Sequence, residues 1–195
     1  AINVSKKRYQ QKKNIIFINK EIKNLNTKNN YFDFAYSLGV LHHISYPKKA
    51  FKIINKKLKK NSPFLVYLYH DFEENSFIYK LIWRLSEILR KFISRRNFYT
   101  KSIICEIIAV IIYYPLAKIS SVLKKINIST KNFPLNYYHD KSFYVMRNDA
   151  LDRFGTKFEK RYSKKDIIKL FKETGFKNIK ISSKSPYWCA IGFKK

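Results

Sequence analysis

Residues 32–69 read FDFAYSLGVLHHISYPKKAFKIINKKLKKNSPFLVYLY and decide the fold of this chain. Phe32–Ser37 is a short apolar run with the aromatic content of a buried strand, and a Gly-containing loop follows it. Apolar residues then recur at helical spacing after Pro47, and a second apolar run, Phe64–Tyr69, predicts another buried strand. This order predicts one right-handed crossover unit of a parallel sheet. Ligands bind at the carboxyl ends of such strands, so a site is expected at Ser37–His43.

The pattern FD-x-x-x-S-x-GVLHH, followed by a P-x-x-A helix, an LK turn and an apolar strand, resembles the middle of a class I S-adenosylmethionine-dependent methyltransferase. The usual family turn is LKPGG, whereas Leu58–Pro63 reads LKKNSP and lacks both glycines. At the other end, Ser163–Phe176 reads S-x-x-D-I-I-x-L-F-x-x-x-G-F and precedes two predicted strands. This ending resembles the last helix and terminal antiparallel pair of the same family.

The resemblance implies an α/β fold, with a mostly parallel Rossmann-like sheet, an antiparallel last strand and an inserted helical cap. It implies a partial cofactor-binding core over residues 1–69, the cap and acceptor region over 70–150, and a completing helix and strand pair over 151–195. Asn14–Asn19 is expected to be a short buried strand, matching the third strand of the family. The four glycines form no G-x-G-x-G loop. We therefore expect an N-terminally truncated domain that binds the cofactor weakly or not at all on its own.

The cofactor implied by the resemblance is S-adenosylmethionine. In the family an acidic residue after the third strand reaches the adenine amine, which assigns this role to Glu21 and places Ile22 against the adenine ring. A solvated Glu21 in a lysine-rich loop is the alternative. The loop at the strand end would pass beside the methionine part, where Gly39 permits close backbone approach. The predicted cofactor-binding residues are Glu21, Ile22, Ser37, Leu38, Gly39 and His42.

Methyl transfer from a sulfonium is a direct displacement that needs an aligned acceptor and often a base. Histidine titrates near neutrality, so His43 and His139 are candidate catalytic bases, with a structural role for His43 as the alternative. Pro134–Arg147, crowded with aromatic and polar side chains, is expected to be a loop or lid lining a pocket. The expected acceptor pocket contains Tyr137, Tyr138, Tyr144 and Arg153. A local salt-bridge network is the alternative for Asp152, Arg153, Glu159 and Arg161.

Two helical stretches are predicted between these parts. Phe77–Ile93 is amphipathic with basic residues on one face, and Ser102–Lys118 is the most apolar stretch of the chain. A membrane-spanning helix needs about 20 apolar residues, but Glu106 interrupts this run and Pro115 follows soon after. Ser102–Lys118 is therefore expected to be a buried helix of an inserted bundle. The alternative is that both helices lie on an anionic bilayer.

The formal net charge of +28 has two interpretations. It favours an anionic partner, or it reflects compositional drift, because Lys, Asn, Ile, Phe and Tyr abound together and the lysines are scattered. Two distant cysteines, Cys105 and Cys189, favour a reducing cytoplasm. The histidines show no metal-ligand spacing, and P-loop and G-x-S-x-G patterns are absent from the sequence, so no metal is expected.

The expected function is S-adenosylmethionine-dependent methyl transfer to a small-molecule acceptor, or to a lipid- or glycan-linked one, held under the cap. A cytoplasmic location with peripheral contact to an anionic membrane fits this expectation. The alternative is a non-catalytic basic module that docks on anionic membrane or RNA through Phe77–Lys125. The sequence shows no recognisable nucleic-acid-binding module, which argues against nucleic acid as the partner.

Overall fold

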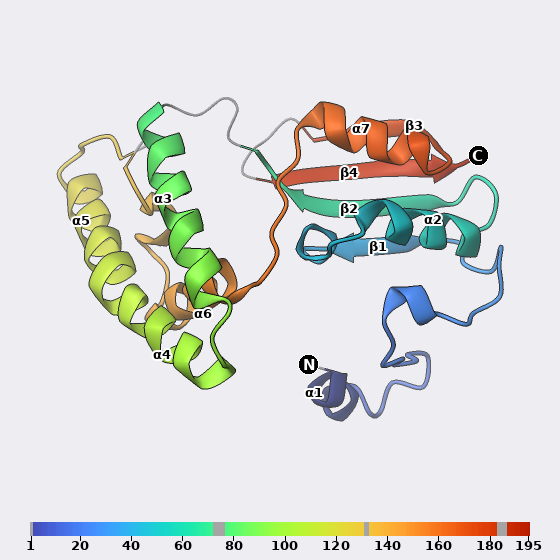
Figure 1. Cartoon of the computed structure of the whole chain (residues 1–195), viewed down its shortest axis with the longest axis horizontal. Coiled ribbons are helices and arrows are strands. Elements are labelled where there is room, and N and C mark those ends of the chain that lie inside the picture. Colours follow the sequence, from blue (N-terminus) through green and yellow to red (C-terminus); the bar gives the residue numbers. More distant parts are fainter. Residues whose placement is uncertain (1, 72–76, 131–132, 183–186) are drawn as a thin grey trace. The chain divides into compact units, whose positions relative to one another are not determined.

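The computed structural model describes residues 2–71, 77–130, 133–182 and 187–195. The chain divides into two compact units (Figure 1). Unit 1 comprises Ala1–Asp71 and Arg161–Lys195, and unit 2 comprises Phe72–Lys160. Compared with the expected boundaries, residues 151–160 fall in unit 2, because helix α6 (Phe143–Gly155) continues into them.

Unit 1 is built on a four-stranded sheet in the order β1-β2-β4-β3 (Figure 1). Strands β1 (Ala35–Leu38) and β2 (Pro63–Tyr69) are parallel neighbours. Strand β4 (Tyr187–Lys194) is antiparallel to both β2 and β3 (Phe176–Ile181). Three strands therefore share one direction and the last strand of the chain opposes them. This confirms the expected Rossmann-like arrangement with an antiparallel last strand.

The two main helices of unit 1 begin and end where the sequence predicts. Helix α2 (Pro47–Lys57) connects β1 to β2 and has proline in its first turn, where a missing N–H costs nothing. Helix α7 (Lys164–Glu173) begins with a capping box: Ser163 accepts from the Asp166 amide, and the Asp166 side chain accepts from the Ser163 amide. Gly175, with φ +89°, follows its end.

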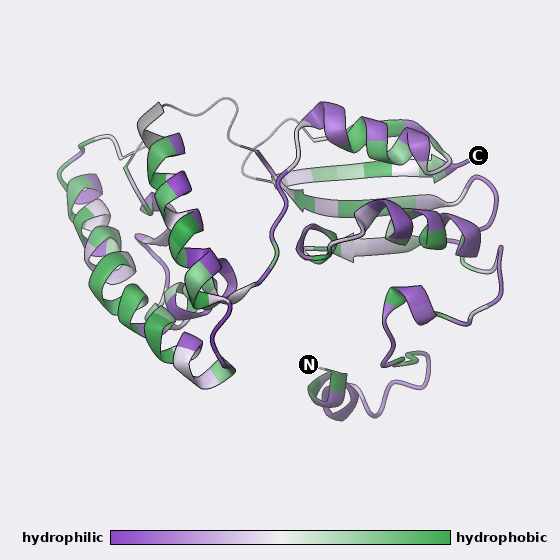
Figure 2. Ribbon diagram, viewed as in Figure 1, coloured by the Kyte–Doolittle hydropathy of each residue, from purple (hydrophilic) through white to green (hydrophobic). Residues whose placement is uncertain are grey.

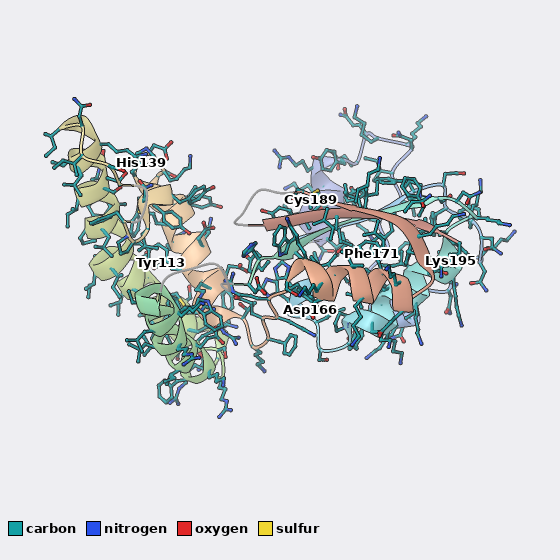
Figure 3. The ribbon with its side chains drawn as sticks, turned by 90° about the horizontal axis from the view of Figure 1, so that it is seen from above. Tyr113, His139, Asp166, Phe171, Cys189 and Lys195 are labelled. Carbon is teal, nitrogen blue, oxygen red and sulfur yellow. The ribbon has the colours of Figure 1, made fainter. Side chains whose placement is uncertain are left out.

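The main core lies on one face of this sheet. Along β2, Phe64, Val66 and Leu68 are fully buried, whereas the alternating residues are half-buried. The centroid of the Phe64 ring lies 5.0 Å from that of Phe51 of α2 and 5.9 Å from that of Phe171 of α7. Phe171 is labelled in Figure 3, where it projects from α7 toward the sheet. Helices α2 and α7 thus cover the same face through aromatic contacts.

The amino-terminal segment departs from expectation. After helix α1 (Ile2–Arg8), residues 14–19 form no strand, and Ile15, Ile16 and Ile18 are exposed. The expected buried strand at Asn14–Asn19 is therefore wrong. A strand needs a neighbour to satisfy its backbone hydrogen bonds, and these residues pair with no strand in the described part of the chain. The segment continues through the short 3₁₀ helix η1 (Ile22–Asn24).

Unit 2 is helical. Helix α3 (Phe77–Ile93) matches its predicted bounds. Helix α4 (Phe98–Ile108), a π-helical turn η3 (Ala109–Tyr113) and α5 (Tyr114–Lys125) form one continuous helix. The π turn ends two residues before Pro115, which lacks an N–H and crowds the preceding turn, so the helix widens there. A 3₁₀ turn, η4 (Asn136–Tyr138), and α6 complete the unit.

The loop expected over Pro134–Arg147 is wrong in its second half, where α6 begins. Ser142 caps α6 by accepting from the Val145 amide. Met146, Ala150 and Phe154 then recur every fourth residue and are buried, which gives the helix an apolar face. This face packs with α4 in a second core that includes Cys105 and Ala109.

The expectation of a buried helix at Ser102–Lys118 is also wrong. One side of the continuous helix is buried through Cys105, Ala109, Tyr113, Ala117 and Ser120. The opposite side is exposed, although it is equally apolar. Only 22% of the most apolar window of this helix is buried, because α6 covers it from one direction.

Candidate functional site

The loop at the carboxyl end of β1 is open on the side of Gly39. Gly39 has φ +71°, and its amide donates to the Tyr67 carbonyl at 3.2 Å, which extends the β1–β2 pairing by one residue. No heavy atom lies within 4 Å of an ideal Cβ placed at Gly39. Leu38 and Val40 on either side are about half exposed. This backbone can therefore be approached closely by a ligand.

His42 is buried beneath this loop, in the 3₁₀ turn η2 (Leu41–His43). Its ring stacks on Tyr69 of β2, with centroids 3.8 Å apart. Neither ring nitrogen has a partner of normal hydrogen-bond geometry in the described chain. Burial lowers the pKa of His42 to about 3, and the charges of His43 and Arg161 act in the same direction, against a weaker opposing effect of the Tyr67 carbonyl. His42 is thus a neutral packing group at physiological pH.

Tyr69 brings together residues from distant parts of the chain. The ring of His43 lies edge-on to Tyr69, with centroids 5.7 Å apart. The guanidinium of Arg161 lies 5.1 Å from the centroid of the same ring and donates to the His70 carbonyl at 3.1 Å. From the sequence alone, Arg161 was expected only in a local salt-bridge network. The parallel bridge between His70 and Tyr162, which brings Arg161 here, has no local sequence pattern.

The residues assigned to adenine lie elsewhere on unit 1. Glu21 is exposed directly before η1 and forms an ion pair with Lys23 at 2.7 Å. Ile22 is half-buried and packs against the main core. The structure therefore gives Glu21 a cationic neighbour within its own turn and gives Ile22 an apolar support.

His139, which is labelled in Figure 3, and three of the acceptor candidates belong to η4, α6 and the turn between them in unit 2. His139 Nδ1 lies 2.8 Å from the Asn136 carbonyl oxygen, and Nε2 lies 3.0 Å from Lys124 Nζ. Tyr138 donates its hydroxyl hydrogen to Asp149 at 3.0 Å. Tyr137 and Tyr144 are exposed, and each has a cation over its ring.

Arg153, the fourth acceptor candidate, is engaged in an internal network. It donates to Glu87 of α3 at 2.7 Å, to Ser86 at 2.8 Å and to Glu159 at 3.4 Å. Arg90 donates twice to the same Glu87 carboxylate, at 2.9 and 2.7 Å. The network joins α3 to α6. The local salt-bridge network given as the alternative for Arg153 included Glu159 but not Glu87, which lies 66 residues away.

No group of three or more His, Cys, Asp or Glu side chains suited to a metal ion occurs among the described residues. Both cysteines are free thiols, Cys105 buried and Cys189 exposed.

Comparison with known proteins agrees with the fold. Residues 1–66 match the family model described as "Methyltransferase domain". No curated protein matches the chain. Solved structures that match include a SAM-dependent methyltransferase, possible histamine N-methyltransferase, from Thermotoga maritima, at 14% identity and a TM-score of 0.49. The match covers 98% of this chain and 70% of that one.

Two further structures have longer chains. DszA carbon methyltransferase has 11% identity and a TM-score of 0.51, with 99% of this chain and 37% of that chain covered. PKMT2 from Rickettsia typhi in complex with AdoHcy has 14% identity and a TM-score of 0.48, with 92% and 32% covered. This chain thus spans about a third of the length of these two. Residues 1–66 are thus similar to the methyltransferase domain family, and the fold of the chain is that of a SAM-dependent methyltransferase domain such as DszA carbon methyltransferase.

Proposed function

We propose that this chain serves S-adenosylmethionine-dependent methyl transfer to a small-molecule acceptor, or to a lipid- or glycan-linked one. The observation that carries the proposal is the open backbone at Gly39, at the carboxyl end of β1, within the stretch that matches the methyltransferase domain. S-adenosylmethionine, when bound, supplies an electrophilic methyl group on a sulfonium. A reducing, cytoplasmic location accords with the two free thiols.

The residues of unit 1 fit part of this cofactor. The backbone of Ser37, Leu38 and Gly39 would carry the methionine part, because a positive φ and open space allow contact with main-chain atoms. Glu21 and Ile22 would meet the adenine, as a hydrogen-bond acceptor and an apolar surface. His42 would hold the loop in place through its stacking on Tyr69. The chain has no G-x-G-x-G loop, so we expect weak binding.

Binding is tested by nuclear magnetic resonance of the chain with S-adenosylhomocysteine. We expect a dissociation constant in the roughly millimolar range, with amide shifts at Ser37–Gly39 and at Glu21–Ile22. Adenosine alone should shift only the second group, because it lacks the methionine part. The absence of shifts in the Ser37–Gly39 amides at saturating S-adenosylhomocysteine would reject the cofactor site.

The identity of the catalytic base is tested by the rate at which a labelled methyl group is transferred from S-adenosylmethionine. The label is counted separately in lipid extracts and in water-soluble products. His43 lies next to the loop and would accept a proton from the acceptor. We expect His43→Gln to lower the rate at least about 100-fold while S-adenosylhomocysteine binding stays unchanged. His139→Gln is the matched comparison. A rate loss in His139→Gln alone would move the base to unit 2.

A further inference from the structure

Helix α3 carries its apolar side chains on the outside. Six large apolar residues are each about half exposed and recur at helical spacing, so they form one stripe along the helix. The opposite side holds Glu87 and Arg90, which are bonded to each other and to Arg153 or Thr156 of unit 2. A helix of a soluble domain normally turns its apolar stripe inward. The α3 stripe consists of Leu81, Ile82, Leu85, Ile88, Leu89 and Phe92.

The continuous helix Phe98–Lys125 repeats this arrangement. The buried side consists of Tyr113 and four small residues between Cys105 and Ser120, and the exposed side is rich in isoleucine and valine. Figure 2 shows apolar residues concentrated along both α3 and this helix. Exposed apolar surface of this extent marks an interaction site rather than ordinary surface. The exposed apolar residues of the second stripe are Ile103, Ile107, Val110, Ile111, Ile112, Ile119, Val122 and Ile126.

Basic side chains accompany both stripes. Arg84 and Lys91 are exposed on α3. In the turn after this helix, Arg95 and Arg96 are exposed as well. The guanidinium of Arg96 lies 4.3 Å from the centroid of Phe92, at the end of the first stripe. On the continuous helix, Lys118 lies over the ring of the partly exposed Tyr114, 5.3 Å from its centroid. Long cationic side chains beside apolar ones can extend to anionic headgroups while the stripe enters the acyl region.

Acidic groups hardly oppose this charge. In the described part of 77–125 the acidic residues are Glu87 and Glu106, and Glu87 faces the interior network. An RNA partner would pair with the basic side chains but would leave both apolar stripes exposed to water. A second copy of the chain would cover the stripes but bring like charges together. An anionic bilayer complements both the apolar stripes and the cationic residues.

We propose that unit 2 docks on an anionic lipid bilayer through the α3 stripe and the exposed side of Phe98–Lys125. The proposal is independent of the methyl-transfer function. By length and composition, Phe98–Lys125 could also cross a membrane. However, its inner side packs against α6, and Ser120 on that side donates to Asn136 at 2.9 Å. Only one side is therefore available to lipid, and the helix lies in the plane of the interface.

The test is co-sedimentation of the chain with vesicles of phosphatidylglycerol and phosphatidylcholine in equal parts, beside vesicles of phosphatidylcholine alone. We expect strong binding to the first and at least about tenfold weaker binding to the second. Raising sodium chloride from about 50 mM to about 500 mM should weaken binding to the anionic vesicles, because exposed charges are screened. Equal binding to both vesicle types, or to neither, would overturn the proposal.

Two variants separate the apolar and charged contributions. Leu85→Gln with Ile88→Gln keeps strong helix formers on α3 and should lower partitioning roughly tenfold or more. Arg95→Gln with Arg96→Gln should lower it about tenfold or more on anionic vesicles only. Lys169→Gln with Lys172→Gln, on the exposed side of α7 in unit 1, is the matched charge control and should bind nearly as wild type. Circular dichroism verifies folding, and if the apolar variant is unfolded the charge pair decides the test.

Partners other than a bilayer would give different results in these experiments. If the α3 variant binds vesicles like wild type, the stripe does not meet lipid and the proposal fails. If light scattering shows a dimer without lipid that the α3 variant abolishes, the stripe is an interface between copies and the proposal also fails. If RNA binds tightly and the α3 variant leaves vesicle binding unchanged, the basic residues serve nucleic acid instead.

Discussion

His42 gives the acid sensitivity of unit 1 a specific source. Its pKa is lowered from 6.5 to about 3 in the folded chain, chiefly by burial, so between these values only the unfolded chain takes up a proton. The free energy of unfolding must therefore fall as pH drops below 6.5. Relative to His42→Phe, the wild type should lose about 1 kcal/mol more between about pH 6.5 and about 5.5. Urea unfolding at several pH values measures this difference.

His139→Phe is the control for this prediction, because it removes an imidazole that is partly exposed rather than buried. Parallel pH profiles of wild type and His42→Phe would show that the ring is protonated without cost, contrary to its burial against Tyr69.

Gly39 and Gly192 are required for different physical reasons. At Gly39 a side chain meets no atom but must adopt φ +71°, so Gly39→Ala should cost about 1 kcal/mol of strain. Gly39→Asn should cost less, because Asn tolerates the left-handed region. At Gly192 an added Cβ would lie 2.6 Å from Phe171 Cδ1 in the core, so Gly192→Ala should cost roughly 2 kcal/mol.

The expected order of these three stability losses is checked by urea unfolding. The unfolding midpoints are read from the fluorescence of Trp188, which lies in the main core. A Gly39→Asn variant as unstable as Gly192→Ala would contradict the open space beside the loop.

At the scale of elements, the sequence predicts what local chemistry determines. Helix α7 has its cap, its apolar face and its stop between Ser163 and Gly175, and the structure confirms all three. Strand β2 is an apolar run between turn residues and forms as predicted. Residues 14–19 have the same apolar character but pair with no strand in the described chain. The apolar pattern alone therefore gave a wrong prediction of a strand there.

The direction in which a helix turns its faces is not local information. The pattern of α3 predicts an amphipathic helix correctly, yet its apolar side lies outward. The reason is Glu87, which Arg90 and Arg153 hold inside unit 2 from two different helices. For the candidate site, the loop over Ser37–His43 was predictable from the strand and glycine pattern. The contact of Arg161 with Tyr69 was not, since it joins residues 92 positions apart through the fold.

The Glu87 network should determine how firmly α3 is attached. Burial raises the pKa of Glu87, but hydrogen bonds from Arg90 and Arg153 outweigh burial and leave the pKa below its usual value. Glu87→Gln removes the carboxylate that both guanidinium groups share in a largely buried position and leaves Arg153 only its longer pair with Glu159, so unit 2 should lose roughly 3 kcal/mol. This stabilisation should be present above pH about 4.5 and be lost as pH falls through the lowered pKa.

Hydrogen exchange of the α3 and α6 amides measures the loss. Glu106→Gln is the matched control, because its pair with Arg147 spans 3.6 Å and both side chains are about half exposed, so it should change stability by less than about 1 kcal/mol. Equal effects of the two changes would show that the Glu87 network adds no more than a surface pair.

For the molecule as a whole, a high positive charge is combined with uncovered apolar surface. The formal net charge is +28. In unit 1, Tyr36 and Leu38 of β1 and Phe34 directly before it are exposed, and the outer edge of β1 pairs with no strand among the described residues. A free strand edge with apolar side chains favours pairing with a second copy. Repulsion between the charges opposes that pairing, so the balance should depend on salt.

Self-association should therefore increase with salt, opposite to the salt dependence expected for docking on anionic vesicles. Sedimentation velocity in about 50 mM and about 500 mM sodium chloride should show more dimer or oligomer at the higher concentration, because screening removes the repulsion. Phe34→Lys with Tyr36→Lys should suppress it, since lysine on an edge strand blocks pairing. Tyr137→Lys adds charge at an exposed aromatic of unit 2 and should have a much smaller effect. Association that weakens with salt would mean that ion pairs, not the apolar edge of β1, bring the chains together.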